Sequence, residues 1–227
     1  MTFYKIIAAA LLASGLVACA GTGDDLPAET EEGLQRVSGS RVDAAYMAPG
    51  ADLGQYEVLY ISEVRVSFVK NWLEDQNRER RSTSNRLSQE DADRIKAAVA
   101  EDFRKIFTEN LEEAGYTVIA DKSGAGAEDD VLVLLPAIVD LDVAAPDTRS
   151  PGRSRTYTTT AGSMSLYMEM YDGLTSALIA RVADSQSAPD YGTMQITNSV
   201  TNRAEADRMM KKWAKLLVKA LDEAHGK

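Results

Sequence analysis

The sequence has little of two residue types that carry much of protein chemistry. Among 227 residues there is one cysteine, Cys19, and one histidine, His225. His225 lies two residues before the end of the sequence, where chains usually fray. Cysteine and histidine are the usual ligands of transition metals and the usual nucleophile and base of covalent catalysis. We therefore expect no catalytic residue, no metal site and no cofactor, and we predict that the protein is not an enzyme.

Cations are also scarce relative to acids. The chain has 25 lysines and arginines against 35 aspartates and glutamates, a formal net charge of −10. Nucleic-acid backbones and anionic headgroups attract positive charge. The balance therefore argues against nucleic acid as a partner and against a protein that lies flat on an anionic membrane surface.

No run of apolar residues is long enough to span a bilayer, which takes about 20. The longest run begins at Ile6, after the single cation Lys5, and apart from Ser14 and Gly15 it continues to Ala18. A short positive region, an apolar stretch of roughly 7–15 residues and then small residues are the layout of a secretory signal peptide. We predict that residues 1–18 form such a signal.

The small residues lead directly to the only cysteine. Leu16, Val17, Ala18 and Cys19 resemble the bacterial lipobox, in which the cysteine thiol becomes a thioether to lipid and the preceding residues admit the peptidase. We predict Cys19 as the lipidation site and Leu16, Val17 and Ala18 as the signal-recognition residues. The alternative is that Cys19 is an ordinary apolar residue of a signal peptide.

A triacylated cysteine would anchor the protein without spanning the membrane, because its acyl chains exceed the two signals that stable anchoring needs. The residue after the cysteine is Ala20 rather than aspartate. By resemblance to Gram-negative lipoproteins, this favours the outer membrane. Acylation would also leave the chain without a free thiol.

The segment after the cysteine is polar and acidic. It reads GTGDDLPAETEEGLQRVSGSR and has scarcely any large apolar residue, which favours disorder. We predict a lipidated N-terminus and flexible tether over residues 19–45 and a single globular domain over residues 46–227 that faces the periplasm.

Within this domain, strand patterns and helix patterns alternate. We predict strands over 56–69, 116–120, 131–143 and 163–171, with a partner for the last after Gly173, and helices over 89–114 and 202–224. In the first strand, one face is expected to be apolar and the other charged: the apolar face carries Val58, Tyr60, Val64, Val66 and Phe68 with Ser62, and the other carries Glu57, Glu63 and Arg65. The order indicates an α+β fold, a two-layer sandwich in which a mostly antiparallel sheet is packed by two long amphipathic helices.

Local signals predict the boundaries and turns. Ser88 and Asp91 resemble a capping box at the start of the first helix, and Gly115 is placed to end it. Asp172-Gly173 between two strand-like runs predicts a type I′ hairpin. Pro136 suggests a bulge or an edge position for its strand, because proline donates no hydrogen bond to a neighbouring strand.

Residues 71–87, NWLEDQNRERRSTSNRL, are predicted to form a charged loop that is basic within an acidic protein. Tryptophan and arginine are enriched at binding hot spots. Trp72, Arg78, Arg80 and Arg81 are therefore our candidate partner-binding residues, and the partner would be an acidic envelope protein or peptidoglycan. The alternative is a solvated arm with Trp72 folded back on the core.

Other patterns have ordinary explanations. Asp140 and Asp142 lie on one face of their strand and have the chemistry for calcium or acid–base work, but acids on an exposed face are common. The methionines of the hairpin and the last helix are expected to fill the core. The lysines of the last helix are expected to form a solvated surface, with a docking face as the alternative.

Three stretches have a wider resemblance: YMAPGADLGQYEVLYISEVRVSF (Tyr46–Phe68), LSQEDADRIKAAVAEDFRKIFTENLEEAGYTVIAD (Leu87–Asp121) and MYDGLTSALIARVADSQ (Met170–Gln186). Together they resemble the bacterial lipoproteins grouped as domain of unknown function 3313. The resemblance covers most of the predicted domain and implies a one-domain envelope lipoprotein. It carries no known catalytic residue that can be transferred.

Two functions of different classes remain. The leading hypothesis is a non-catalytic accessory or adaptor subunit of an envelope complex, by analogy with periplasmic lipoprotein modules that recruit or regulate envelope machines. The alternative is a lipoprotein that binds a small apolar or lipid ligand between sheet and helices, and an envelope hydrolase is third. A large apolar pocket would favour the ligand, and a filled core with an exposed groove would favour the adaptor.

Overall fold

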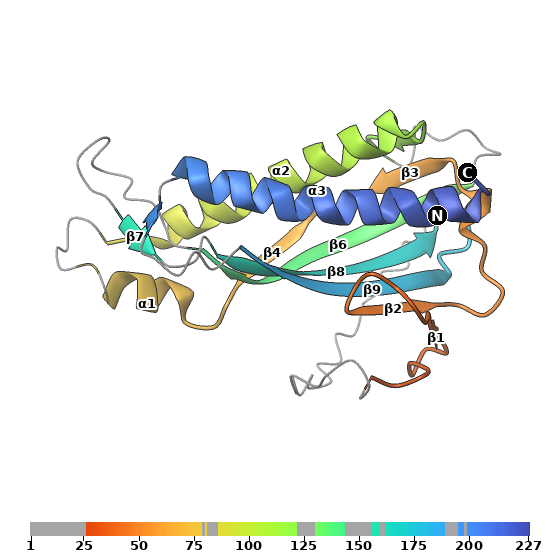
Figure 1. Cartoon of the computed structure of the whole chain (residues 1–227), viewed down its shortest axis with the longest axis horizontal. Helices are drawn as coiled ribbons and strands as arrows, with labels where there is room; N and C mark the ends of the chain where they lie inside the picture. The colour runs from red at the N-terminus through yellow and green to blue at the C-terminus, as the bar shows by residue number, and fades with distance from the viewer. Residues whose placement is uncertain are drawn as a thin grey trace, which may run out of the picture.

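A computed structural model describes residues 26–78, 80, 86–121, 130–143, 156–158, 162–188, 195–197 and 199–227. Two long helices, α2 (Gln89–Glu113) and α3 (Ser199–Ala224), lie side by side on one face of a sheet (Figure 1). A short helix, α1 (Trp72–Arg78), lies at one end of the molecule (Figure 1). The predicted α+β sandwich with two long helices is confirmed, and α1 is an addition to it.

The main sheet has eight strands in the order β1-β2-β9-β8-β6-β3-β5, with β4 also paired to β6. The strands are β1 (Gln35–Arg36), β2 (Ala44–Met47), β3 (Val58–Ile61), β4 (Arg65–Phe68), β5 (Thr117–Ile119), β6 (Val131–Asp142), β8 (Ser163–Asp172) and β9 (Leu178–Ser187). Pairings from β1 to β6 are antiparallel, whereas β3 and β4 run parallel to β6, and β5 runs parallel to β3. A separate antiparallel pair joins β7 (Thr156–Thr158) and β10 (Gln195–Thr197).

The ends of α2 are as predicted. The Ser88 hydroxyl accepts a hydrogen bond from the Asp91 amide at 3.1 Å, and the Asp91 carboxylate accepts one from the Ser88 amide at 2.8 Å. This capping box satisfies two amides that no helical carbonyl can reach. After the last turn, Gly115 takes a φ of 92°, a left-handed conformation that ends a helix at little steric cost.

The core lies between the sheet and the two long helices. Strand β6 is central, and Leu132, Leu134 and Ile138 on it are fully buried. On α2, Phe103 and Phe107 stack with ring centroids 3.9 Å apart. The helix α3 adds an apolar stripe at helical spacing that includes Met209, Met210, Trp213, Ala214, Leu217 and Leu221.

The prediction of a single strand over residues 56–69 is wrong, because β3 and β4 are separate strands joined by residues 62–64. The apolar face expected for this stretch is also not the one that β3 buries. Leu59 and Ile61 are buried, while Val58 and Tyr60 are only half-buried. Both faces of β3 carry large apolar side chains, so that alternation alone does not say which face packs on the helices.

Pro136 lies in a central strand and not at an edge, so the edge position suggested for it is wrong. Its place on β6 falls between the last pair with β3, Ile61 with Leu134, and the first pair with β4, Arg65 with Ala137. The gap between β3 and β4 therefore leaves Pro136 opposite no strand residue on that side, where a missing donor is tolerated. The bulge of β6 comes later, where the register shifts between Val139 and Asp142.

The hairpin of β8 and β9 is confirmed, but its turn spans residues 173–177 instead of the two residues predicted. The Asp172 carboxylate accepts a hydrogen bond from the Thr175 amide at 2.6 Å, and Ser176 takes a φ of 60°. Gly173 is required by space: a Cβ there would lie 2.8 Å from the Val131 carbonyl oxygen.

The N-terminal segment extends the sheet, and the predicted tether boundary at residue 45 is therefore wrong. Strand β2 pairs with β9, and β1 pairs with β2. Leu34 is buried, and the Tyr46 hydroxyl donates to the Pro27 carbonyl at 2.9 Å. These contacts place the chain from Leu26 onward in the folded domain, and they include a strand pairing with β9, which lies about 140 residues further along the chain.

The charged loop expected over residues 71–87 begins instead as helix α1. Asn71 precedes it with a φ of 64°, and acidic Glu74 and Asp75 stand in its first turn, where the helix dipole favours negative charge. Residues 79 and 81–85 lie outside the described residues.

Candidate functional site

Strand β8 presents two chemically different faces. Residues at every second position, Met164, Leu166, Met168 and Met170, are buried toward the helices. The alternate positions carry Tyr167, Glu169 and Tyr171, which lie on the opposite face of the sheet. Alternation with a period of two thus sends the methionines to one side and the polar groups to the other.

The methionine face opens into a cleft of about 430 Å³ between α3 and the sheet. We call it the α3 cleft, and its apolar wall comes from β8, β9, β2, α3 and the 3-10 helix (Leu53–Gln55). That wall includes Met47, Leu53, Leu166, Met168, Met170, Ala180, Val182, Trp213, Leu216 and Leu217. Small-molecule sites in proteins typically occupy ~300–1,000 Å³ and are lined mostly by apolar side chains, and this cleft has both properties.

The α3 cleft is hollow because small side chains meet there. Across the sheet, Met47 pairs with Ala180 and Ala45 pairs with Val182, so that alanines stand where larger residues would reach α3. Ala220 on α3 faces the same space. Protein interiors pack at crystal-like density, and alanine at three facing positions leaves a volume that the surrounding side chains do not fill.

The loop between β1 and β2, residues 37–43, covers one side of the cleft. A reciprocal pair of hydrogen bonds fixes the base of this loop to β9. The Asp43 amide donates to the Asp184 carboxylate at 3.1 Å, and the Ser185 amide donates to the Asp43 carboxylate at 2.9 Å. The segment expected to be a tether therefore forms part of the candidate site.

One wall of the cleft is held by a buried polar contact. The Trp213 indole N–H donates to the Asp184 carboxylate at 2.8 Å, and both residues are at most 5% exposed. A buried carboxylate needs such donors, because an unpaired charge in the interior is costly. This bond ties α3 to β9 beside the cleft and sets the orientation of the indole ring.

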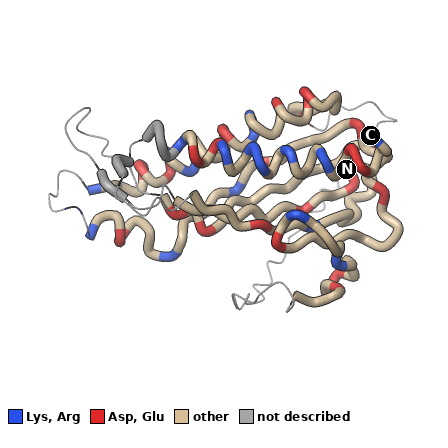
Figure 2. Tube along the Cα trace, in the orientation of Figure 1, with Lys and Arg blue, Asp and Glu red and all other residues tan. Residues whose placement is uncertain are grey.

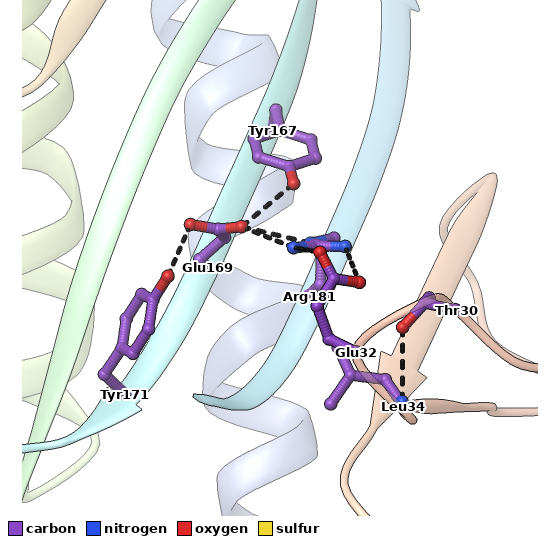
Figure 3. Close-up of polar contacts among 7 residues, drawn as sticks. All are labelled: Thr30, Glu32, Leu34, Tyr167, Glu169, Tyr171 and Arg181. Atoms are coloured by element: carbon purple, nitrogen blue, oxygen red, sulfur yellow. Dashed lines mark hydrogen bonds and ion pairs between the residues drawn. The ribbon is translucent and has the colours of Figure 1, made fainter. Parts of the chain in front are cut away.

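The opposite face of the sheet carries a network around Arg181 of β9 (Figure 3). The guanidinium donates to the Glu169 carboxylate at 2.8 Å and 3.1 Å, and to the Glu32 carboxylate at 3.0 Å and 3.1 Å. The hydroxyls of Tyr167 and Tyr171 donate to the same Glu169 carboxylate, at 3.0 Å and 2.8 Å. The network joins the N-terminal segment to the hairpin.

The pKa values in this network reflect these bonds. Burial acts to raise the pKa of Glu169, but hydrogen bonds from Tyr171, Arg181 and Tyr167 outweigh it and hold that pKa below its ordinary value. Hydrogen bonds from Arg181 lower the pKa of Glu32 to about 2. Burial raises the pKa of both Tyr167 and Tyr171 to about 12. Every group is therefore held in its ordinary charge state at neutral pH, which fits a structural clamp better than an acid–base catalyst.

Of the candidate partner-binding residues, the structure describes Trp72, Arg78 and Arg80, and only Arg78 is exposed. Trp72 is 3% exposed, stacks on Phe68 with centroids 3.8 Å apart and donates to the Val143 carbonyl at 2.8 Å. Its side chain belongs to a small satellite core, as in the alternative with Trp72 folded back. Arg78 is exposed and pairs with Asp75, and Arg80 is half-buried. Arg81 lies outside the described residues, as do Cys19, Leu16, Val17 and Ala18.

The remaining candidates are surface or core residues. Asp140 and Asp142 are both exposed, and Asp140 lies within the bulge of β6, where the register shifts between Val139 and Asp142. Within the described ranges, no group of three or more histidine, cysteine, aspartate or glutamate side chains is arranged to hold a metal ion. In the same part of the chain, none of the helices combines the length and apolarity needed to cross a bilayer. The methionines of β8 and α3 are buried in the core as expected, and Met168 and Met170 also line the cleft.

The chain matches the sequence pattern of the protein family of unknown function DUF3313 over residues 28–217. It belongs to that family. The match begins within the N-terminal segment that pairs with β9, in agreement with a domain that starts before residue 45. No curated protein matches the chain.

Several solved structures are similar in outline. The PelC dodecamer from Paraburkholderia phytofirmans has 10% identity and a TM-score of 0.40, covering 76% of this chain and 96% of that one. A minor lipoprotein from Acinetobacter baumannii has 8% identity and a TM-score of 0.35, covering 75% and 94%. A DUF330 protein from Xanthomonas campestris has 11% identity and a TM-score of 0.30, covering 73% and 86%. Such distant likenesses assign no function to this chain.

Proposed function

We propose that this DUF3313 protein is a membrane-tethered lipoprotein that binds a small apolar or lipid ligand in the α3 cleft, and that it binds this ligand without transforming it. The observation that carries the proposal is the cleft itself, with its volume of about 430 Å³ and a wall of leucine, methionine and tryptophan side chains. Of the two functions left open by the sequence, this is the one that a large apolar pocket favours.

The composition of the wall suits a flexible apolar guest. Three methionines, Met47, Met168 and Met170, line the cleft. The thioether side chain is unbranched and polarizable, so it adapts to irregular ligand shapes and is common at binding surfaces that accept several partners. Polar groups lie at the edge, on the β1–β2 loop and at Lys219 and Glu223 of α3. An alkyl chain or another slender apolar group matches this arrangement.

The proposed anchor places the cleft near a membrane. In this proposal Cys19 is lipidated, and Ala20 after it directs the protein to the outer membrane, facing the periplasm. Only six residues lie between Cys19 and Leu26, where the described chain begins, so that seven residue steps join the two. At ~3.5 Å per extended residue this tether reaches about 25 Å at most. Its length keeps the domain close to a source of lipid.

The ligand proposal is tested by filling the cleft. Ala180→Leu adds three carbons to a wall residue, whereas Ala183→Leu makes the same change on the other face of the same strand. Full-length protein in isolated envelopes is incubated with a diazirine-bearing C16 alkyl alcohol, irradiated and recovered, and labelled peptides are identified. We expect labelling on β8 and α3 in the wild type and in Ala183→Leu, and a loss of about tenfold in Ala180→Leu.

Equal labelling of the wild type and Ala180→Leu, or labels only outside β8, β9, β2 and α3, would overturn the ligand proposal. The anchor is tested separately with Cys19→Ser in cells fed labelled palmitate. The mutant should incorporate no label and accumulate as a precursor, and any label that enters it would exclude lipidation at Cys19.

An accessory role is a second candidate, and the position of α1 favours it. This helix lies at one end of the molecule, and it bears Arg78, whose side chain is 76% exposed (Figure 1). An acidic envelope protein or peptidoglycan would meet the cations of residues 70–87, of which there are five against three acids. We would reverse the charges of Arg78, Arg80 and Arg81 together and compare envelope crosslinks and peptidoglycan sedimentation with a triple reversal on α2, at Arg94, Lys96 and Lys105. Unchanged crosslinks and sedimentation in the α1 variant would exclude this surface.

A further inference from the structure

A second hollow adjoins the α3 cleft on the outer side of the helix. This basic groove is lined by Arg41 of the β1–β2 loop and by successive turns of α3. The two hollows share three lining residues, Arg41, Leu216 and Lys219. The two hollows therefore border each other at these side chains, and the lining changes from apolar to cationic across them.

The charge of the groove is opposite to that of the chain. Its lining has six cations and one carboxylate, in a protein whose formal net charge is −10. The cations are Arg41, Arg208, Lys211, Lys212, Lys215 and Lys219, and the carboxylate is Asp207. Figure 2 shows the basic positions recurring along α3. Concentrated positive charge in a protein otherwise acidic creates a local potential that attracts anions.

The cations nearest the cleft differ in how far they are neutralised. Lys219 pairs with Glu223 at 3.2 Å, and Glu223 is the carboxylate that lines the cleft itself. Lys212 donates to the neutral Gln186 amide oxygen at 2.8 Å. Among the described residues, Arg41 and Lys215 form no ion pair. Their charges are therefore available to a bound anion, with Arg41 on the rim shared with the cleft.

We propose that the ligand of the α3 cleft is an anionic single-chain amphiphile, whose alkyl chain lies against Met168, Met170 and Leu217 while its carboxylate or phosphate head occupies the basic groove beside Arg41 and Lys215. This inference rests on the proposed ligand-binding function and names its ligand class. The geometry behind it is the continuity of an apolar cleft with a cationic groove across one shared rim.

The test varies the head group and the rim independently. Four C16 probes carry the same chain diazirine and differ only in the head: carboxylate, phosphate, alcohol and trimethylammonium. Each is titrated against the full-length protein in nanodiscs of neutral phosphatidylcholine. The proteins are the wild type, Ala180→Leu, the rim variant Arg41→Gln with Lys215→Gln, and the control Arg65→Gln with Lys105→Gln. The last pair removes two exposed charges that line neither hollow, so both double variants change the net charge equally.

We expect the wild type to be half-labelled at about tenfold lower concentration of an anionic probe than of the alcohol, and the rim variant to lose most of that advantage while the control keeps it. The preference should shrink between 0.05 and about 0.5 M salt, because the groove is exposed to screening. Preference for the carboxylate or for the phosphate would identify the natural head group.

The failures of the two proposals are distinguishable. Equal labelling by the anionic, neutral and cationic probes, all of it still sensitive to Ala180→Leu, would overturn the head-group inference and leave the cleft as an apolar site. Labelling that is insensitive to Ala180→Leu with every probe would remove the proposed function itself. An anionic preference that survives in the rim variant would show that the groove does not hold the head group.

Discussion

The two faces of strand β8, which are formed by alternate residues, differ in the kind of contact that they make. Toward the helices, Met168 and Met170 contact apolar side chains and border an open volume. On the opposite face, Glu169 accepts hydrogen bonds from three side chains with fixed geometry. Hydrogen bonds are directional and fix atoms in place, whereas apolar contacts tolerate rearrangement. One face is therefore suited to hold a segment of the chain, and the other is suited to admit a guest.

The N-terminal segment connects these two faces. On the outer face, Glu32 binds Arg181, and a few residues later the β1–β2 loop passes to the inner face and is fixed there by Asp43 and Asp184. The polar network is thus coupled through residues 33–42 to the loop that covers the cleft. Fixed contacts on one face therefore position the loop that covers the cleft on the other, and each prediction below tests one part of this arrangement.

Removing the centre of the polar network should have the largest effect. Arg181→Leu leaves the Glu169 carboxylate, which is 14% exposed, without its counter-charge. Loss of one partner of a buried ion pair costs about 3 kcal/mol of unfolding free energy. Urea unfolding followed by circular dichroism measures this loss, and hydrogen exchange should show faster exchange over residues 28–47. The exposed Arg65→Leu on β4 is the control, and an equal loss in both variants would contradict a special role for the network.

The inner face should respond less to the loss of one polar contact. Trp213→Phe removes the indole donor to Asp184 while keeping an aromatic ring, and leaves a buried acceptor with fewer partners. We expect a loss of about 1–3 kcal/mol in unfolding free energy. Adding Asp184→Asn to Trp213→Phe should recover part of this loss, because a neutral amide costs less to bury than a carboxylate. No recovery in the double variant would mean that packing of the indole, rather than its hydrogen bond, stabilises this wall.

Sequence reasoning succeeded where structure is determined locally. The capping box at Ser88, the end of α2 at Gly115 and the core position of the β8 methionines depend on neighbouring residues, and all three are confirmed. A helix boundary depends on only a few adjacent side chains. In a strand with one polar and one apolar face, the alternation predicts which side chains point toward the core. The overall sandwich followed from these elements in order.

Most of the candidate site cannot be predicted from the sequence, because the residues that form it are far apart in the chain. Residues 26–45 look like a tether by composition, yet β2 pairs with β9 near the far end of the chain. Ala45, Ala180 and Ala220 have no pattern that marks them as neighbours, yet all three line the cleft. The sequence predicts that the lysine face of α3 is a solvated surface or a docking face. It does not predict that this face adjoins an apolar cleft, because the two hollows share Arg41, which lies far from α3 in the chain.

The polar face should also be sensitive to acid. Glu32 has its pKa lowered to about 2 and Glu169 has its pKa lowered too, so both contribute stability above their unfolded values near ~4.3 that is lost as the pH falls through the folded values. The difference in unfolding free energy between the wild type and Arg181→Leu should therefore be full above about pH 4.5 and shrink toward pH 2. A difference that stays constant or grows on acidification would contradict this assignment.

The smallest change tests the inner face alone. Met168→Leu conserves volume and hydrophobicity, so it should cost less than about 1.5 kcal/mol in unfolding free energy, with no dependence on pH because no titrating partner is lost. Its effect should appear in binding, since branched leucine adapts less well than methionine to guests of different length. Photo-labelling with a series of alkyl carboxylates from C10 to C16 should show a narrower range of chain lengths in Met168→Leu than in the wild type.

Met164→Leu, on the same face of β8 but outside the cleft, is the matched control. If both variants keep the full range, the adaptability of the cleft does not reside in the Met168 side chain, and the contrast between the two faces of β8 reduces to polarity alone.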